Sequence, residues 1–350
     1  MDSPIILDIS KSTDKRQLND LVKKNVNILD HYDLQVRELF EIRYPGLIGN
    51  VDAFNNFKQE REFSLGKHIY YPWKNQIIKI LDTDEFYELR TARNNPLFSP
   101  KTQAKLRELK IGIAGLSVGS NIVRGLVYAG IGRRFKIADP DVLETSNLNR
   151  ISGNLLDLGK NKTEIMARQI WEIDPYIEIV QYNHGIIGTN LENFLSESFK
   201  LDAIFDEVDD ISLKIYLKIA ARASKLSYFM VTDNGYSAEL DVCRFDLKEE
   251  NQELQDFPHF SMKEVADTLS YIEKVVLTPV EEQKLIDTLI GSENRAEEMK
   301  IAGKLRLANK IKGWPQLQSV AGIGAGMAVY ALKLMVEGKL KSVKKVISLE

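Results

Sequence analysis

The spacing of hydrophobic residues changes near Lys110. From there to Asp246, short apolar runs alternate with segments in which apolar residues recur every three or four positions. The runs are KIGIAG, RFKIAD, IEIVQY, LDAIFDEV and YFMVTDN, and the segments between them include SNIVRGLVYAG, KTEIMARQIWEI and ISLKIYLKIAARASK. Alternation of buried strands with amphipathic helices is typical of a doubly wound, mostly parallel α/β sheet. We predict that fold for this part of the chain.

The chain before this region has a different pattern. Residues 14–43 have the spacing of a helix, which Pro45 and Gly46 end. HIYYPWKNQIIKIL, residues 68–81, predicts two short strands around Trp73–Gln76. We therefore expect both helix and strand in this N-terminal part.

Two short helices are predicted next. Residues 82–90 follow Asp82, a favourable N-cap, with Glu85 three positions on as in a capping box. A second helix begins at Ser99-Pro100, because proline is favoured in the first turn, and runs to about Leu109.

These patterns suggest two parts. We expect a small α+β extension over residues 1–95 and the nucleotide-binding α/β domain over residues 96–350. Residues 247–312 are charged and helical in pattern, which predicts a helical insertion in that domain. Residues 238–246 alternate apolar and polar positions like a half-exposed strand, and residues 318–338 predict a long apolar core helix rich in small residues.

Composition excludes several classes of protein. The 350 residues are 44% hydrophobic and 28% charged with a net charge of −3, and they contain no block of like charge that would indicate nucleic-acid binding. Cys243 is the single cysteine, so neither an internal disulfide nor a cysteine-built structural zinc site is expected. The N-terminus lacks the features of a signal peptide, and we expect no membrane-spanning segment. The chain is expected to be cytoplasmic.

The stretch IGIAGLSVGSN, residues 111–121, predicts a strand that leads into a helix through a small-residue loop. Free amides and the helix dipole make such a helix start an anion site. Gly115 and Gly119 permit the tight turn, whereas Ser117 and Ser120 occupy places where the dinucleotide fingerprint G-x-G-x-x-G has glycine. The loop therefore favours a nucleotide and weakens the case for NAD.

Charged residues follow the next strand. Asp139 ends that strand and Asp141 lies two positions on, where an acid commonly binds ribose hydroxyls in NAD and ATP sites alike. SNLNR then supplies Asn147 and Arg150, and LGKNK supplies Lys162. Hydride transfer needs no such cations beside the ribose, but chemistry at a phosphate does, because negative charge gathers in its transition state.

Four acids, Asp206, Glu207, Asp209 and Asp210, follow the fourth strand of this region in FDEVDD. Ligands collect at the carboxyl ends of strands in parallel sheets, and a carboxylate there is well placed to hold the Mg²⁺ of Mg-ATP. Asp210 precedes a helical pattern, which makes it a candidate helix cap instead.

Together G-x-S-x-G-S, ADPDVLETSNLNR, LGKNK and FDEVDD resemble the ThiF/MoeB/HesA adenylyltransferases, relatives of the ubiquitin-activating enzymes. The resemblance covers residues 110–246 motif by motif, and residues 318–338 resemble the family's closing helix. It implies a Rossmann-like ThiF-type fold that uses Mg-ATP to join AMP to a carboxylate. Residues 68–109 also resemble the segment before this fold in a bacterial subgroup that can carry a fused nitroreductase-like domain, and the chain could be part of such a longer protein.

The resemblance also implies roles for residues. The nucleotide would contact the loop residues Gly115, Ser117, Gly119 and Ser120, the acids Asp139 and Asp141, and the phosphate-binding residues Asn147, Arg150 and Lys162. Asp139 would bind the ribose, Lys162 would stabilise the reacting α-phosphate, and Asp209 would bind Mg²⁺. An arginine upstream of the fold would act at the partner's ATP in a homodimer; Arg93 is the first choice and Arg90 the second.

The sequence departs from the family in two respects. The loop lacks two family glycines, and neither the zinc cysteine pairs of many members nor the catalytic cysteine of some is present. Cys243 lies within a strand pattern, and we interpret it as a small buried apolar residue that forms no thioester.

Three functions are compatible with these features. The leading hypothesis is an ATP-dependent adenylyltransferase that makes an acyl-adenylate from a carboxylate-bearing substrate, which could be a small ubiquitin-like protein or a small molecule. The alternatives are an NAD(P)-binding oxidoreductase and a nucleotide-binding scaffold that has lost catalysis. The two serines, Arg150 and Lys162 disfavour the oxidoreductase.

Overall fold

The computed structural model describes residues 3–61, 65–248, 278, 280–281 and 295–350. The chain divides into two compact units. The first comprises Met1–Pro100 together with Arg168–Tyr176, and the second comprises Lys101–Ala167 and Ile177–Glu350.

The first unit contains a four-stranded sheet in the order β1-β3-β4-β2, in which β2 runs parallel to β4 and the other pairs are antiparallel. Its strands are β1 (Ile5–Leu7), β2 (Asn27–Asp30), β3 (Lys67–Tyr71) and β4 (Gln76–Ile80). Its helices are α1 (Ser12–Lys23), α2 (Tyr32–Arg43), α3 (Val51–Gln59) and α4 (Thr83–Thr91). Aromatic and aliphatic side chains of α2 pack on α3 and Leu81 to form the local core. Strands β3 and β4 confirm the two strands predicted in residues 68–81.

The prediction of continuous helix over residues 14–43 is wrong. Helix α1 ends at Lys23, Asn25 adopts a left-handed φ of 59°, and the chain then forms β2 before α2 begins. In β2, Ile28 and Leu29 pair with β4. Helical spacing alone did not reveal this strand, because four residues are about one helical turn and barely interrupt the spacing of apolar residues. Pairing with β4 then outweighs the local preference for helix.

Helix α4 follows Asp82 as predicted, but the expected capping box is absent. The Asp82 side chain accepts no hydrogen bond from the helix, and Glu85 forms an ion pair with Arg61 instead. Residues 168–176 are held in this unit by tyrosine hydroxyls. Tyr71 donates to the carbonyl of Trp171 at 2.9 Å, and Tyr176 donates to the carbonyl of Leu81 at 2.6 Å.

The second unit contains a seven-stranded sheet in the order β11-β10-β9-β8-β5-β6-β7. The five strands from β9 to β7 in that order run parallel, and β10 and β11 are antiparallel additions at one edge. The strands are β5 (Lys110–Ala114), β6 (Arg134–Ala138), β7 (Glu178–Tyr182), β8 (Ala203–Asp206), β9 (Ser227–Asn234), β10 (Ser237–Arg244) and β11 (Val343–Ser348). Each predicted apolar run forms a strand, so the prediction of a doubly wound, mostly parallel sheet is confirmed.

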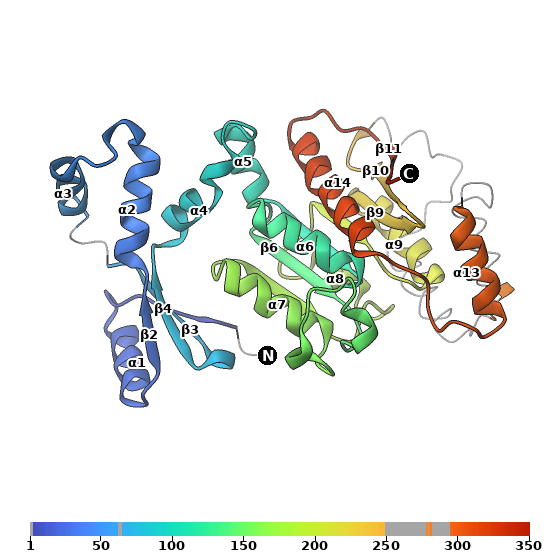
Figure 1. Ribbon diagram of the computed structural model, residues 1–350, viewed down its shortest axis with the longest axis horizontal. Coiled ribbons are helices and arrows are strands. Elements are labelled where there is room, and N and C mark those ends of the chain that lie inside the picture. Colours follow the sequence, from blue (N-terminus) through green and yellow to red (C-terminus); the bar gives the residue numbers. More distant parts are fainter. Residues whose placement is uncertain (1–2, 62–64, 249–277, 279, 282–294) are drawn as a thin grey trace. The chain divides into compact units, whose positions relative to one another are not determined.

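Helices lie on both faces of this sheet (Figure 1). The helices that follow α4 in the described residues are α5 (Pro100–Arg107), α6 (Val118–Tyr128), α7 (Lys162–Ile173), α8 (Leu191–Ser196), α9 (Ile211–Ala223), α13 (Glu297–Leu307) and α14 (Gln318–Val336). Helix α9 packs with α8 on one core cluster, which includes Leu217, Phe194 and Tyr228. Helix α14 packs on α6, β9 and β10.

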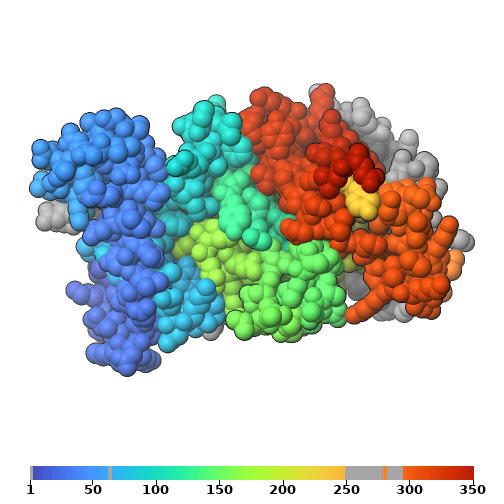
Figure 2. Space-filling view, viewed as in Figure 1, coloured from blue at the N-terminus to red at the C-terminus, as the bar shows by residue number. Residues whose placement is uncertain are grey.

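Helix α14 is the long apolar helix predicted at residues 318–338. Its small residues allow close contact with the sheet: a Cβ at Gly324 would lie 2.3 Å from Cγ1 of Val231. Among the described residues, this helix alone is long and apolar enough to cross a membrane, although 39% of its most apolar window is buried. Figure 2 shows part of α14, in red, at the surface of this unit.

The predicted helical insertion at residues 247–312 is only partly covered by the described residues. Residues 249–277, 279 and 282–294 lie outside them. In the remainder, α13 is helical as expected, and the guanidinium groups of Arg295 and Arg306 lie 5.0 and 4.5 Å from the centroid of the Trp314 ring.

Candidate nucleotide-binding site

Glycine permits the tight passage from β5 into α6 at two places, Gly115 in the loop and Gly119 in the first turn of α6. Gly115 has a φ of +89°, and a Cβ there would lie 2.2 Å from the carbonyl oxygen of Glu207. A Cβ at Gly119 would lie 2.9 Å from Cγ2 of Ile113. The loop therefore passes close to the neighbouring strand ends, and its amides stand at the start of α6, as a phosphate-binding turn requires.

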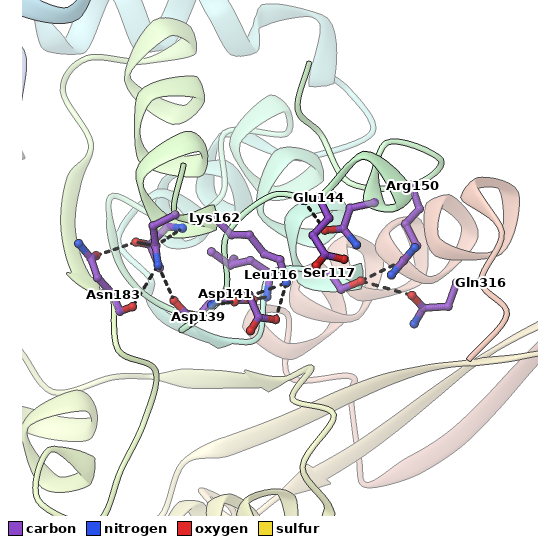
Figure 3. Close-up of polar contacts among 12 residues, drawn as sticks. Leu116, Ser117, Asp139, Asp141, Glu144, Arg150, Lys162, Asn183 and Gln316 are labelled. Atoms are coloured by element: carbon purple, nitrogen blue, oxygen red, sulfur yellow. Dashed lines mark hydrogen bonds and ion pairs between the residues drawn. The ribbon is translucent and has the colours of Figure 1, made fainter. Parts of the chain in front are cut away.

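The two serines of this loop have different environments. Ser120 is buried, and its hydroxyl donates to the carbonyl of Ser117 at 2.8 Å, so this hydroxyl is engaged in the first turn of α6. The Ser117 hydroxyl instead accepts from Nε of Arg150 at 3.1 Å and donates to Oε1 of Gln316 at 3.3 Å (Figure 3). Ser117 thus connects the loop to the guanidinium group that the sequence marked as a phosphate ligand.

Asp139 lies at the centre of the second group of polar contacts (Figure 3). Its carboxylate accepts from the amides of Leu116 at 2.7 Å and Asp141 at 2.8 Å, and it is 4% exposed. Burial raises the pKa of this carboxyl, and the ammonium group of Lys162 opposes that rise. The acid therefore fixes the glycine loop against the end of β6.

Lys162 lies at the start of α7 and is 8% exposed. Its Nζ lies 2.8 Å from Oδ2 of Asp141 and 3.6 Å from Oδ1 of Asp139. The fold thus brings together the two acids after β6 and the lysine of the GKNK motif. The buried Asp139 and the exposed Asp141 together hold the ammonium group of Lys162 in one place.

The SNLNR segment forms turns, and Asn147 and Arg150 have different roles in it. The 3-10 turn Thr145–Asn147 begins there, and the Asn147 side chain accepts from the amide of Glu144 at 3.0 Å. Asn147 therefore shapes the turn, while Arg150 extends to Ser117. Burial lowers the pKa of Arg150, and the carboxylates of Asp209 and Asp233 oppose this change.

The four acids after β8 separate into distinct roles. Asp206 is buried, accepts from the Tyr228 hydroxyl at 2.8 Å and lies 3.3 Å from Nζ of Lys214. Glu207 is also buried and accepts from the amide of Val231 at 2.9 Å; burial raises its pKa well above the usual range.

The other two acids are exposed. Asp210 caps α9 by accepting from the amide of Leu213 at 2.9 Å, which confirms the expected capping role. Asp209 is exposed and contributes to the electrostatic environment of Arg150. Within the described residues, no group of three or more His, Cys, Asp or Glu side chains could hold a metal ion. A nucleotide-bound Mg²⁺ takes phosphate oxygens and needs only one or two carboxylates.

Two residues of this region were missed by sequence reasoning. Gln316 precedes α14 and bonds both Ser117 and, through its carbonyl, the side-chain amide of Asn149. Asp233 lies near the end of β9, and burial raises its pKa to about 6, with Arg150 opposing the rise. The rule that ligands gather at strand ends could have identified Asp233 in YFMVTDN, whereas nothing local marks Gln316.

The two candidate upstream arginines both lie in the first unit. Arg90 forms an ion pair with Asp174, at 2.9 Å, within that unit. Arg93 lies in the short turn Ala92–Asn94 and is exposed. The structural role of Arg90 makes Arg93 the better candidate for an arginine that acts on a second subunit.

The chain is similar to known proteins over this region. A model of the ThiF family matches residues 90–346. The Mycobacterium tuberculosis protein named Uncharacterized protein MT1398 is 35% identical over 180 residues, which are 51% of this chain and 24% of that protein. The tRNA threonylcarbamoyladenosine dehydratase of Haemophilus influenzae is 26% identical over 184 residues, which are 51% of this chain and 67% of that one.

The fold has a counterpart among solved structures. The structure described as TcdA (CsdL) superposes with a TM-score of 0.50 at 17% identity, covering 74% of this chain and 98% of that chain. This likeness confirms the Rossmann-like α/β architecture. The chain spans about a quarter of the length of the M. tuberculosis relative, which leaves the activity of the whole protein to be proposed from the site.

Proposed function

The chain belongs to the ThiF family, and from this premise we propose that it is an ATP-dependent adenylyltransferase that activates a carboxylate as an acyl-adenylate. The observation that carries this proposal is that one glycine loop is linked to two cations, to Arg150 through Ser117 and to Lys162 through Asp139. Arg150 is held by Ser117 of the loop, and Lys162 is held by Asp139, whose carboxylate accepts from the loop amide of Leu116.

This arrangement suits chemistry at an α-phosphate. In the proposed reaction, a carboxylate oxygen of the substrate bonds to the α-phosphorus while the bond to the bridging α–β oxygen breaks, and pyrophosphate leaves. Negative charge on the attacking and leaving oxygens must be stabilised where it develops. The guanidinium group of Arg150 and the ammonium group of Lys162 supply two fixed positive charges, and the amides at the start of α6 supply donors.

Other residues of the site would bind and orient the nucleotide. Each oxygen of the Asp139 carboxylate accepts one backbone amide, and its remaining lone pairs can accept ribose hydroxyls. Asp141 is exposed beside it and could do the same. Mg²⁺, when bound with ATP, would neutralise phosphate charge, and exposed Asp209 would be the protein ligand that holds it.

The proposal extends to partners and assembly. The substrate carboxylate could belong to a small ubiquitin-like protein or to a small molecule. We propose a homodimer in which Arg93 reaches the nucleotide of the other subunit, since a two-fold pair is the commonest symmetric assembly. A cytoplasmic location and the absence of a structural zinc site are also parts of this proposal.

ATP–pyrophosphate exchange tests this function directly. Labelled pyrophosphate should enter ATP when the correct carboxylate is present, and the panel should contain both small carboxylic acids and Gly-ended small proteins. Calorimetry with ATP and NAD, each with Mg²⁺, tests nucleotide choice without knowledge of the substrate. Tight NAD binding with no ATP binding would show that the oxidoreductase hypothesis is correct and that this proposal is wrong.

A further inference from the structure

Asp233 faces the same side of the sheet as the glycine loop. Two residues before it on β9, Val231 packs against Gly324 of α14, and side chains two apart on a strand share one face. Helix α14 packs on α6, which begins at the loop. Asp233 therefore lies on the face of the sheet that α6 and α14 cover. The backbone amides at the start of α6 are on this same face.

Asp209 and Asp233 follow the paired residues of two neighbouring strands, β8 and β9. Phe205 of β8 pairs with Phe229 of β9, and beyond the end of β8 the side chain of Glu207 still bonds the amide of Val231. Asp209 and Asp233 each lie two residues beyond this contact, after the paired part of the two strands. Arg150 is influenced by the charges of both carboxylates, which agrees with their lying on one side of its guanidinium group.

The carboxylate of Asp233 lacks the partners that a buried acid needs. Both of its oxygens are buried, and neither accepts a hydrogen bond from any described residue. A buried polar group without a partner costs free energy, so such a group in a site indicates that a ligand supplies the partner. Arg150 provides only a nearby positive charge.

The chemistry of the proposed reaction limits what that ligand can be. Phosphate oxygens at neutral pH accept hydrogen bonds and repel an ionised carboxylate, so the polyphosphate itself is no partner for ionised Asp233. The ribose is expected beside Asp139, which follows β6, and β5 and β8 separate β6 from β9 in the sheet. Once Arg150 contacts a phosphate, its charge is shared, and Asp233 needs a further cation.

We propose that Asp233 is a second carboxylate ligand, with Asp209, of the divalent cation that accompanies the nucleotide. Two carboxylates together with phosphate oxygens form an ordinary Mg²⁺ environment. This inference rests on the proposed function, because the cation would enter with ATP. It assigns to the end of β9 a role that the sequence motifs of the site do not include.

The test measures how strongly the metal tightens nucleotide binding. Calorimetry gives the dissociation constant of α,β-methylene-ATP, which cannot release pyrophosphate, once in EDTA and once in Mg²⁺ or Mn²⁺. The ratio of the two constants is the metal enhancement. In Asp233→Asn, which preserves shape, we expect the enhancement to fall about tenfold or more, as is typical when one group of a metal site is removed. Binding in EDTA should stay unchanged or tighten, because a negative charge beside the phosphates is gone.

Two further variants complete the experiment. Asp209→Asn should lose the enhancement to a similar degree. Asp210→Asn is the matched control, because it removes one negative charge from the adjacent position while asparagine still caps α9; its enhancement should stay within about threefold of wild type.

The outcomes separate the two proposals. An unchanged enhancement in Asp233→Asn, with loss in Asp209→Asn, would overturn the inference and leave the adenylyltransferase proposal intact. Equal losses in Asp233→Asn and Asp210→Asn would also overturn it, because they would indicate a general charge effect. A wild-type protein that binds no nucleotide in either condition would refute the proposed function and this inference with it.

Discussion

Arg150 donates a hydrogen bond from Nε to the hydroxyl of Ser117, 3.1 Å away. Ser117 stands where the dinucleotide fingerprint has glycine, so a residue that first suggested a weakened nucleotide loop instead supplies a partner for a cation of the site. A guanidinium group held in advance loses less conformational freedom when it binds a phosphate. With serine rather than glycine at position 117, the backbone cannot approach a pyrophosphate as closely, but Arg150 is held in position beside the loop.

Ser117→Ala should weaken catalysis while leaving the fold intact. The hydroxyl accepts from a charged donor, and such a bond contributes about 1.5–3 kcal/mol at most. We expect pyrophosphate exchange to fall about tenfold, with little change in thermal unfolding. Ser120→Ala is the control, because its hydroxyl is bonded within the first turn of α6. A larger loss of exchange in Ser120→Ala than in Ser117→Ala would contradict this account.

Removal of either site cation should have a larger effect. Arg150→Ala and Lys162→Met each delete a charge that would act in the transition state, which is typically worth about 3–4 kcal/mol, or a few hundredfold in rate. ATP binding should also weaken, as calorimetry would measure. Lys160→Ala is the matched control, since Lys160 is bonded to Asp157 and lies outside the proposed contacts. If Lys160→Ala lost as much activity as Lys162→Met, the assignment of Lys162 would be wrong.

Much of the second unit could be predicted from the sequence because its signals are local. Buried parallel strands give continuous apolar runs, and Asp139, Arg150 and Lys162 lie in motifs that can be recognised in the sequence, although their contacts could not be read from it. Asp210 could be assigned as a cap for the same reason.

Other features depend on contacts between distant segments, which local pattern does not encode. Strand β2 forms because it pairs with β4. Glu85 forms no capping box because its carboxylate pairs with Arg61. Gln316 reaches Ser117 from the segment before α14, almost two hundred residues along the chain. Asp233 could have been found by extending the strand-end rule to β9, but its lack of partners is visible only in three dimensions.

Mixing of inactive variants tests the proposed action of Arg93 across a dimer. Neither Arg93→Ala nor Lys162→Met should support exchange alone, but a mixed dimer would contain one site with Lys162 and the partner's intact arginine. Random mixing in equal amounts would give about a quarter of wild-type activity, since half of the dimers are mixed and each has one intact site. Arg90→Ala mixed with Lys162→Met is the control, because Arg90 is the other candidate arginine and pairs with Asp174 within its own unit. An active monomer at micromolar concentration would refute the dimer proposal.

Lys136 should give a pH-dependent stability that is independent of nucleotide. It is fully buried on β6, where Nζ donates to the carbonyl of Asn193 at 3.0 Å and lies 4.8 Å from the centroid of the Phe199 ring. Burial lowers the pKa of Lys136 to about 8, with the charge of Glu197 opposing. The charged form is therefore penalised in the folded state relative to the unfolded state.

The sign of the pH effect follows from proton binding. Between about pH 8 and 10.5 the unfolded chain keeps the lysine proton that the folded chain has released, so this residue adds stability as pH rises through that window and costs stability below it. Lys136→Met should raise the free energy of unfolding at pH 7 by up to about 3 kcal/mol. Urea unfolding at pH 7 and 9 checks this; a variant less stable than wild type at pH 7 would contradict it.

Cys243 should form no thioester during catalysis. It lies on β10, where Ala238 faces α14, and residues an odd number of positions apart on a strand face opposite sides. Cys243 packs instead on the cluster under α9, on the face away from Asp233. The fold also brings Lys218 of α9 near the thiol, which the sequence did not indicate, although Lys218 forms its ion pair with Asp241 at 3.1 Å.

Cys243→Ala should therefore keep both pyrophosphate exchange and transfer of the acyl group, at a stability cost of about 1 kcal/mol because a small partly buried side chain is replaced conservatively. The prediction could fail, because Lys218 lies beside the thiol and a nearby cation favours the nucleophilic thiolate. Exchange measured with and without a thiol-blocking reagent, and mass spectrometry of the intact protein after incubation with ATP and substrate, would detect an adduct. A variant that kept exchange but lost transfer, together with a thiol-sensitive adduct in wild type, would refute this prediction. The sheet would then have to rearrange to bring opposite faces of β10 to one site.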